Sequence, residues 1–200
     1  MVEVLVTLVI LMLGLLGIAG LQVRAHQAEM ESYQRVQALI LLQDMVDRLN
    51  NNRIVATCYA ITTNPTNGKP FLGTALPVAD YVGGSLACSA GTPAQQATAL
   101  ADLAAWNQAL QGAAETATAG GVSSNAGAIV GARGCITVVN AVTRVYRISV
   151  SWQGRVPTID PAANDPVLGA NTQLTCGSGN YGDERMRRIV STTVRIGSLS

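Results

Sequence analysis

The stretch VEVLVTLVILMLGLLGIAGLQV, residues 2–23, decides how the rest of this chain is organised. Its only charge is the carboxylate of Glu3, because residues 4–23 are uncharged. An apolar run of this length forms a helix that can cross a bilayer core of about 30 Å. A carboxylate at the end of such a run is costly in lipid unless a partner neutralises it. The position of Glu3 therefore calls for an explanation.

The run is a poor fit to a secretory signal peptide. No Lys or Arg precedes it, and it is longer than the roughly 7–15 apolar residues of a typical signal-peptide core. The nearest cation, Arg24, lies on the far flank, so the distribution of basic residues does not settle the orientation of the segment.

The helical pattern continues beyond the apolar run, because no Gly or Pro interrupts residues 24–49. Apolar residues recur there at steps of three or four: Met30, Tyr33, Val36, Leu39, Leu42, Val46 and Leu49. This pattern predicts one helix of nearly fifty residues, about 75 Å long, which ends at Asn50–Asn52. Its first half is apolar all round, and its second half carries one stripe that we expect to pack on a globular domain.

Three glycines, Gly14, Gly17 and Gly20, lie near one face of the apolar half. Small residues permit close packing between helices in membranes. Glycine also weakens a helix by up to about 1 kcal/mol relative to alanine. The two interpretations are compatible, and both remain open.

The middle of the chain predicts loops around one short helix. Residues 53–92 and 113–134 are rich in turn-forming residues, which favours loops. Between them, Thr92 and Gln95 have the spacing of a capping box, with Pro93 at the first helical position. The expected buried face of this helix consists of Leu100, Leu103, Trp106 and Leu110, with Gly112 as its C-cap.

The last third of the chain changes to a period of two. Residues 135–139 and 144–152 flank a turn and predict a hairpin, and residues 187–196 predict a further strand. One face of the second strand is apolar and is expected to lie in the core: Tyr146, Ile148, Val150 and Trp152. Alternation of this kind is typical of an antiparallel sheet that is packed on one side. The expected fold class is α+β, with the long helix on the sheet.

Four cysteines, in an exported domain, favour two disulfides over free thiols. Three pairings are possible, and we favour Cys58–Cys88 with Cys135–Cys176 because each closes a local loop. No two cysteines have the spacing of a zinc knuckle.

The composition argues against several functional classes. The net charge is +1 and aromatic residues make up 4%, so neither a basic patch nor a stacking platform for nucleic acid is expected. No GxSxG, P-loop or HExxH motif is present, and His26 is the single histidine. Asp160, Asp165 and Asp183 lack the spacing of an EF-hand. We predict no enzyme activity, no cofactor and no metal.

Several segments resemble those of type IV pilins, and within them the minor pilins of the PilV kind. The resemblance lies in EVLVTLVILMLGLLGIAGLQ (3–22), LLQDMVDRLNNNR (41–53), DLAAWNQAL (102–110), YRISVSWQGR (146–155) and RRIVSTTVRI (187–196). These segments follow the family's order over most of the chain. Family prepilins carry a short basic leader that ends in Gly, and an aromatic residue ahead of the glutamate. We expect those residues to lie upstream of Met1.

The resemblance implies that the two parts of the chain have different roles. Residues 1–23 would be the transmembrane and filament-core half of the helix, and residues 24–200 the globular headgroup, including helix residues 24–52. Glu3 would pair with the N-terminal amine of a neighbouring subunit, and the glycines would let the helix stretch. The expected partners are major and minor pilins and a tip adhesin. The expected location is the bacterial inner membrane, with a periplasmic headgroup, and then the extracellular pilus.

Alternatives within the same class are a main filament subunit and a pseudopilin of type II secretion. From a different class, a membrane-anchored periplasmic binding module fits the same outline. Such a module would keep its anchor in lipid and would tolerate Glu3→Ala.

Overall fold

A computed structural model describes residues 2–74, 89–113, 115–125, 127, 129–161 and 174–197. A single helix, α1, spans Val2–Asn51, and the short 3-10 helix η1 follows it over Arg53–Tyr59. The other elements are α3 (Pro93–Leu110), β1 (Thr116–Ala119), β2 (Val122–Asn125), β3 (Arg133–Asn140), β4 (Val145–Gln153), η3 (Glu184–Met186) and β5 (Arg187–Arg195). The fold is α+β, as the sequence predicts.

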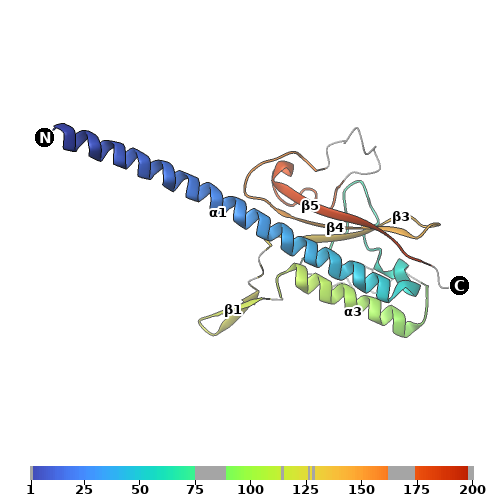
Figure 1. Ribbon diagram of the computed structural model, residues 1–200. Coiled ribbons are helices and arrows are strands. Elements are labelled where there is room, and N and C mark those ends of the chain that lie inside the picture. The colour runs from blue at the N-terminus through green and yellow to red at the C-terminus, as the bar shows by residue number, and fades with distance from the viewer. Residues whose placement is uncertain are drawn as a thin grey trace.

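The main sheet is antiparallel, with strand order β3-β4-β5. Ile148 in the central strand faces Ile136 on one side and Thr192 on the other. The C-terminal half of α1 lies between this sheet and α3, while its N-terminal half projects away from the folded body (Figure 1). We call the folded body, from Glu31 to Gly197, the head.

The core of the head lies between β4, α1 and α3. The apolar face of β4 is buried at all four predicted positions, Tyr146, Ile148, Val150 and Trp152. Trp106 on α3 is fully buried, and its Nε1–H donates to the carbonyl oxygen of Leu41 on α1 at 2.8 Å. A buried indole needs such an acceptor, so this bond also fixes α3 against α1.

The start of α3 has the predicted capping box. The backbone N–H of Gln95 donates to Thr92 Oγ1 at 3.3 Å, and the backbone N–H of Thr92 donates to Gln95 Oε1 at 2.9 Å. Pro93 occupies the first turn, where a missing N–H costs no helical hydrogen bond.

The apolar stripe predicted for the second half of α1 is only partly buried. Met30, Tyr33, Val36 and Leu39 are exposed, whereas Leu42, Val46 and Leu49 are buried. Each step of three residues falls about 60° short of a full helical turn, so the first four positions rotate away from the head. The face that the head covers consists of Gln34, Ala38, Leu42, Met45, Val46 and Leu49.

Two segments predicted as loops contain regular structure. Residues 113–134 include the antiparallel hairpin β1–β2, and residues 53–59 form η1. The hairpin turns at Gly120 and Gly121, where φ is +60° and +81°. Two successive positive φ values characterise the two-residue hairpin turn for which Gly-Gly is favoured. The signal was therefore present in the sequence, although short Thr- and Ala-rich strands concealed it.

One disulfide joins Cys135 in β3 to Cys176, which precedes η3. Their Cα atoms are 5.8 Å apart, within the usual range for a disulfide. The bond fastens the C-terminal segment to the edge strand of the sheet. Cys88 lies outside the described residues, so the pairing of Cys58 with Cys88 remains a prediction.

Candidate functional site

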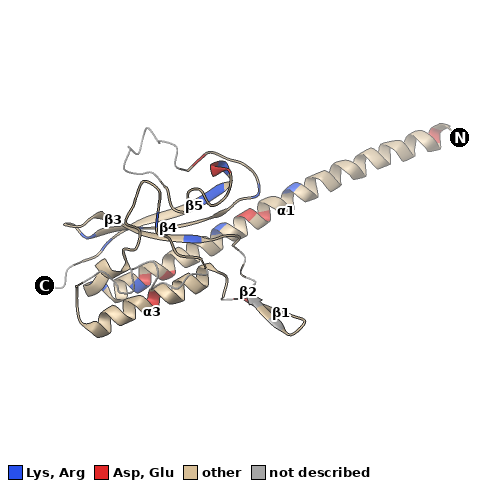
Figure 2. Cartoon of the chain, turned by 180° about the vertical axis from the view of Figure 1, so that it is seen from behind, with Lys and Arg blue, Asp and Glu red and all other residues tan. Residues whose placement is uncertain are grey.

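The most distinctive surface is the N-terminal half of α1. Every residue from Val2 to Met30 is exposed, and this half contains a segment long and apolar enough to cross a membrane. Figure 2 shows this part of the helix free of charged residues between Glu3 at its tip and Arg24. Large apolar side chains that face water on every side of a helix indicate a partner, which is either lipid or another protein.

Glu3 and the three glycines occupy regular positions on this exposed helix. Within the described part of the chain, no cation forms an ion pair with Glu3. A Cβ atom added at Gly14, Gly17 or Gly20 would meet nothing within 4 Å. The helix is continuous through all of them, so neither a kink nor an intramolecular packing contact accounts for the glycines in the isolated chain.

Large apolar side chains are exposed again where α1 enters the head. Tyr33, Val36, Leu39 and Ile40 are 48%, 50%, 47% and 56% exposed. Together with residues 2–23 they form what we call the exposed α1 face, and the polar residues 24–29 separate its two parts. One helix thus presents a long apolar surface, while its opposite side holds the head.

Two ion-pair clusters hold the head on α1. At the far end of the helix, Arg48 contacts Asp44 at 3.0 Å and Asp102 of α3 at 2.9 Å. The hydroxyl of Tyr59 donates to the same Asp102 at 2.5 Å. Burial raises the pKa of Tyr59, and its hydrogen bond to Asp102 raises that pKa further, so the hydroxyl stays a donor.

At the other end of the head, Glu31 of α1 accepts from Arg188 of β5 at 2.5 Å. Sequence reasoning missed this pair and the contact between Arg48 and Asp102, because both join residues far apart along the chain. The local pair Asp44–Arg48 has the i,i+4 spacing that a sequence does reveal.

Residues 20–95 match the family model described as "Tt1218-like: Type IV pilin Tt1218". The match begins in the last turn of the apolar run and ends at the start of α3. It supports a type IV pilin, which is a structural subunit and not an enzyme, and a type IV pilin implies assembly with other pilin subunits. No curated protein and no solved structure matches the chain. Within the described residues, one helix is long and apolar enough to cross a membrane, which is consistent with a membrane-anchored pilin.

Among the described residues, the head buries the charge of Arg187 at the start of β5. The guanidinium of Arg187 is fully buried, with its Nε 2.6 Å from Glu184 and one Nη 3.6 Å from Asp160. It also donates to the carbonyl oxygen of Cys176 at 3.1 Å. Burial by itself would raise the pKa of Glu184, but hydrogen bonds from the backbone N–H of Gly179 and from Arg187 outweigh it and lower that pKa.

No group of three or more His, Cys, Asp or Glu side chains in the described ranges is arranged to hold a metal ion. His26 is highly exposed, and its Nδ1 lies 3.5 Å from the carboxylate of Glu29. Asp165, one of the three aspartates compared above with the EF-hand pattern, lies outside the described residues.

Proposed function

We propose that this chain is a minor type IV pilin of the PilV kind. It waits in the bacterial inner membrane, with residues 2–23 in lipid and the headgroup in the periplasm, and then enters a filament. The observation that carries the proposal is the exposed α1 face, whose apolar side chains cover residues 4–23 and recur at residues 33, 36, 39 and 40 of a helix whose other end forms the core of the head. The same surface can contact lipid before assembly and neighbouring helices afterwards.

In this proposal Glu3 is the residue that commits the helix to assembly. A carboxylate that leaves water needs a charged partner, because an unpaired buried charge is strongly destabilising. The N-terminal amine of a neighbouring subunit would supply that charge within the filament. The free amine would be exposed by removal of a leader, as the resemblance to prepilins implies.

The three glycines support the same proposal in a different way. Nothing in the isolated chain occupies the space beside Gly14, Gly17 and Gly20, so their value lies in contacts made after assembly. There they would permit close helix packing or a local stretch of α1. Either use requires a neighbour.

The head would face outward from the filament, with residues 1–23 as the core part and residues 24–200 as the headgroup. We assign the chain to a priming or tip position, where it contacts major and minor pilins and a tip adhesin. A main filament subunit or a type II secretion pseudopilin would use the same helix surface, so abundance and gene neighbours distinguish them.

The proposal is tested in cells that express the full-length protein. Filaments are sheared from the surface and analysed by mass spectrometry for this chain. A minor pilin is present at a small fraction of the main subunit, whereas a main subunit dominates the fraction. If the chain stays entirely in the inner membrane while filaments form normally, a membrane-anchored periplasmic module takes the place of the pilin.

A further inference from the structure

In the described part of the chain, strand β5 forms an edge of the main sheet with no strand beside it. The other edge, β3, is covered by the segment 62–72. There Thr62 N–H donates to the carbonyl oxygen of Ile136 at 3.0 Å, and Leu72 exchanges two hydrogen bonds with Gly134. Within the described ranges, no backbone hydrogen bond reaches the outer side of β5. The head thus protects one edge of its sheet and leaves the other free.

The backbone of β5 points outward at every second residue. Gly154 N–H donates to the carbonyl oxygen of Met186 at 2.7 Å, and Ile196 N–H donates to that of Arg144 at 3.0 Å. Because hydrogen-bonded pairs alternate along an antiparallel ladder, the even-numbered residues of β5 bond to β4. The N–H and C=O groups of residues 189, 191, 193 and 195 therefore point away from the sheet. Such a row is a template for one further strand.

The free edge lacks the features that usually prevent edge strands from pairing. Its central residues, IVSTTV (189–194), include no charge, Gly or Pro, and all of them except Ser191 are β-branched. Native proteins commonly place Lys or Pro on such edges. Val190 and Val194 pack against the core but are only partly buried, because the sheet ends beside them. A strand added here would complete their burial.

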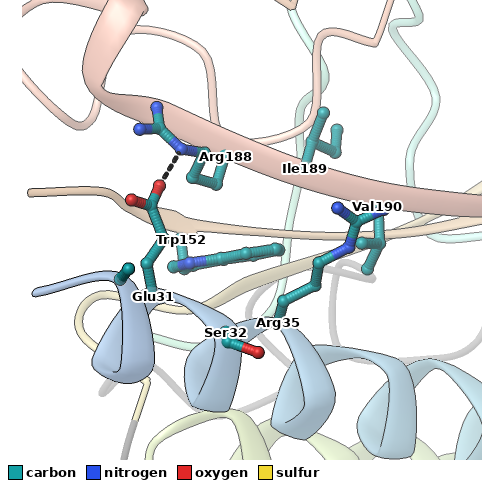
Figure 3. Close-up of a pocket in the computed structure, with 8 residues that line it drawn as sticks. Glu31, Ser32, Arg35, Trp152, Arg188, Ile189 and Val190 are labelled. Atoms are coloured by element: carbon teal, nitrogen blue, oxygen red, sulfur yellow. Dashed lines mark hydrogen bonds and ion pairs between the residues drawn. The ribbon is translucent and has the colours of Figure 1, made fainter. Parts of the chain in front are cut away.

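A cavity of about 450 Å³ lies between α1 and this edge. Ser32 and Arg35 line it from the helix, and β5 contributes residues 188–190. Figure 3 shows Val190 directed toward α1 and Ile189 directed away from it, so Ile189 borders the cavity through its backbone. The cavity therefore reaches the outward N–H and C=O groups of the edge. Every second side chain of an added strand would face α1 and this cavity.

Arg35 determines which side chain suits the cavity. It is exposed, and no hydrogen bond or ion pair joins it to another described residue. The other arginine of the lining, Arg188, is already paired with Glu31 at 2.5 Å, so the lining keeps the positive charge of Arg35. Guanidinium groups form strong, charge-assisted hydrogen bonds with carboxylates. Charge complementarity therefore favours an Asp or Glu side chain in the added strand.

We propose that the free edge of β5 binds an extended, carboxylate-bearing segment of a partner polypeptide as a fourth strand. Backbone hydrogen bonds to residues 189, 191, 193 and 195 give the affinity, and the carboxylate that pairs with Arg35 gives the selectivity. The inference goes beyond the proposed function and does not depend on it, because a pilin and an anchored module would present the same edge.

The test uses the detergent-solubilised full chain and three synthetic peptides, Thr-Val-Thr-X-Thr-Val-Thr, with Glu, Gln or Lys at X. In an extended peptide X and the two Val residues share one face. Binding is measured by the anisotropy of a fluorophore on the peptide. The Glu peptide should bind up to about fivefold more tightly than the Gln peptide, the value of an exposed ion pair, and the Lys peptide should bind least. Arg35→Gln should remove the preference for Glu over Gln.

Two variants of Ser191 test the backbone contribution. Ser191→Pro removes an outward N–H and no bond to β4, and Pro is tolerated on an edge strand at such a position. It should abolish binding of all three peptides. The matched control Ser191→Ala keeps the N–H and should bind the peptides as the wild type does. Near-UV circular dichroism checks that both variants are folded. Unchanged binding by Ser191→Pro, or failure of all three peptides to bind the wild type, would overturn the proposal.

Hydrogen exchange of the wild-type chain tests the geometry without any substitution. The Glu peptide should slow amide exchange at Ser191 and Thr193, whereas Val190 and Thr192 already donate to β4 and should change little. Binding without protection at Ser191 and Thr193 would contradict strand addition. Protection that appears without peptide as the protein concentration rises would replace the partner by a second copy of this chain. None of these outcomes bears on entry into filaments, so the proposed function is tested separately.

Discussion

Arg48 on α1 and Asp102 on α3 form an ion pair, with 2.9 Å between Nη1 and Oδ1. The same carboxylate accepts a hydrogen bond from Tyr59 on η1. One acidic side chain thus joins three separate elements at the end of the head where α1 terminates. This junction helps to set the direction in which the long helix leaves the head.

Replacing Asp102 should therefore destabilise the head. Asp102→Ala leaves the Tyr59 hydroxyl and one edge of Arg48 without their acceptor, and we expect a loss of about 2–3 kcal/mol in the free energy of unfolding. Asp47→Ala is the matched control, because Asp47 is exposed on α1 beside Arg48 and accepts a hydrogen bond from Gln43. It should change stability by less than about 0.5 kcal/mol. Denaturant unfolding of the detergent-solubilised chain, followed by near-UV circular dichroism, measures both.

The head should also lose stability in acid through Glu184. Its pKa in the folded protein lies below the ordinary value of 4.5, so its contribution is present above pH 4.5 and is lost as the pH falls through the folded pKa. Glu184→Gln should reduce the slope of stability against pH in that window. Part of the dependence of stability on pH should remain in this variant, because Arg185 also lowers the pKa of the Asp183 carboxyl. The exposed control Glu115→Gln should leave the slope unchanged, and an equal effect of both variants would contradict this assignment.

Removing the carboxylate of Glu3 should block assembly without releasing the chain from the membrane. Breaking a buried ion pair costs about 3–5 kcal/mol, so Glu3→Ala should reduce the filament-borne fraction by more than about a hundredfold. The apolar run is unchanged, and the inner-membrane pool should stay at the wild-type level. Thr7→Ala, which removes only a local bond to the carbonyl oxygen of Val4, is the control. Normal incorporation of Glu3→Ala would favour the anchored module.

The glycines should matter in the filament but not in the isolated subunit. Gly17→Ala meets no atom within 4 Å in this structure and should stabilise the helix by up to about 1 kcal/mol. If neighbours pack against Gly17, or if α1 stretches there, the same substitution should lower the number of filaments per cell. Immunoblots of sheared filaments and of membranes, compared for Gly17→Ala and Ala19→Gly, separate the two effects. If the Gly17→Ala variant enters filaments as often as the wild type, Gly17 is not needed for assembly.

Local patterns predicted the elements whose signals are strong. The alternation of Tyr146, Ile148, Val150 and Trp152 placed β4 and its buried face, and Thr92 with Gln95 placed the start of α3. The stripe from Met30 to Leu39 was misleading, because an apolar pattern does not say which side of a helix the rest of the chain covers, and these side chains face outward. The burial of Gln34 and Ala38 in their place depends on helix rotation, which tertiary packing decides.

Local sequence patterns could not predict the contacts between distant parts of the chain. Arg188 lies 157 residues from Glu31, and nothing in either neighbourhood specifies the other. The cavity beside Trp152 arises from that same junction of helix and sheet. The free edge of β5 beside it could be recognised only once the order of the strands was known.

The central claim is that the exposed α1 face becomes a subunit contact, and maleimide labelling of Ile40→Cys tests it most directly. Ile40 is 56% exposed on that face, and Val142, in the turn between β3 and β4, is 93% exposed and provides the control Val142→Cys. A membrane-impermeant maleimide is applied to spheroplasts and to sheared filaments. We predict that Ile40→Cys reacts in the membrane pool and is protected in filaments, while Val142→Cys reacts in both. Equal reaction of Ile40→Cys in the two pools would contradict the account.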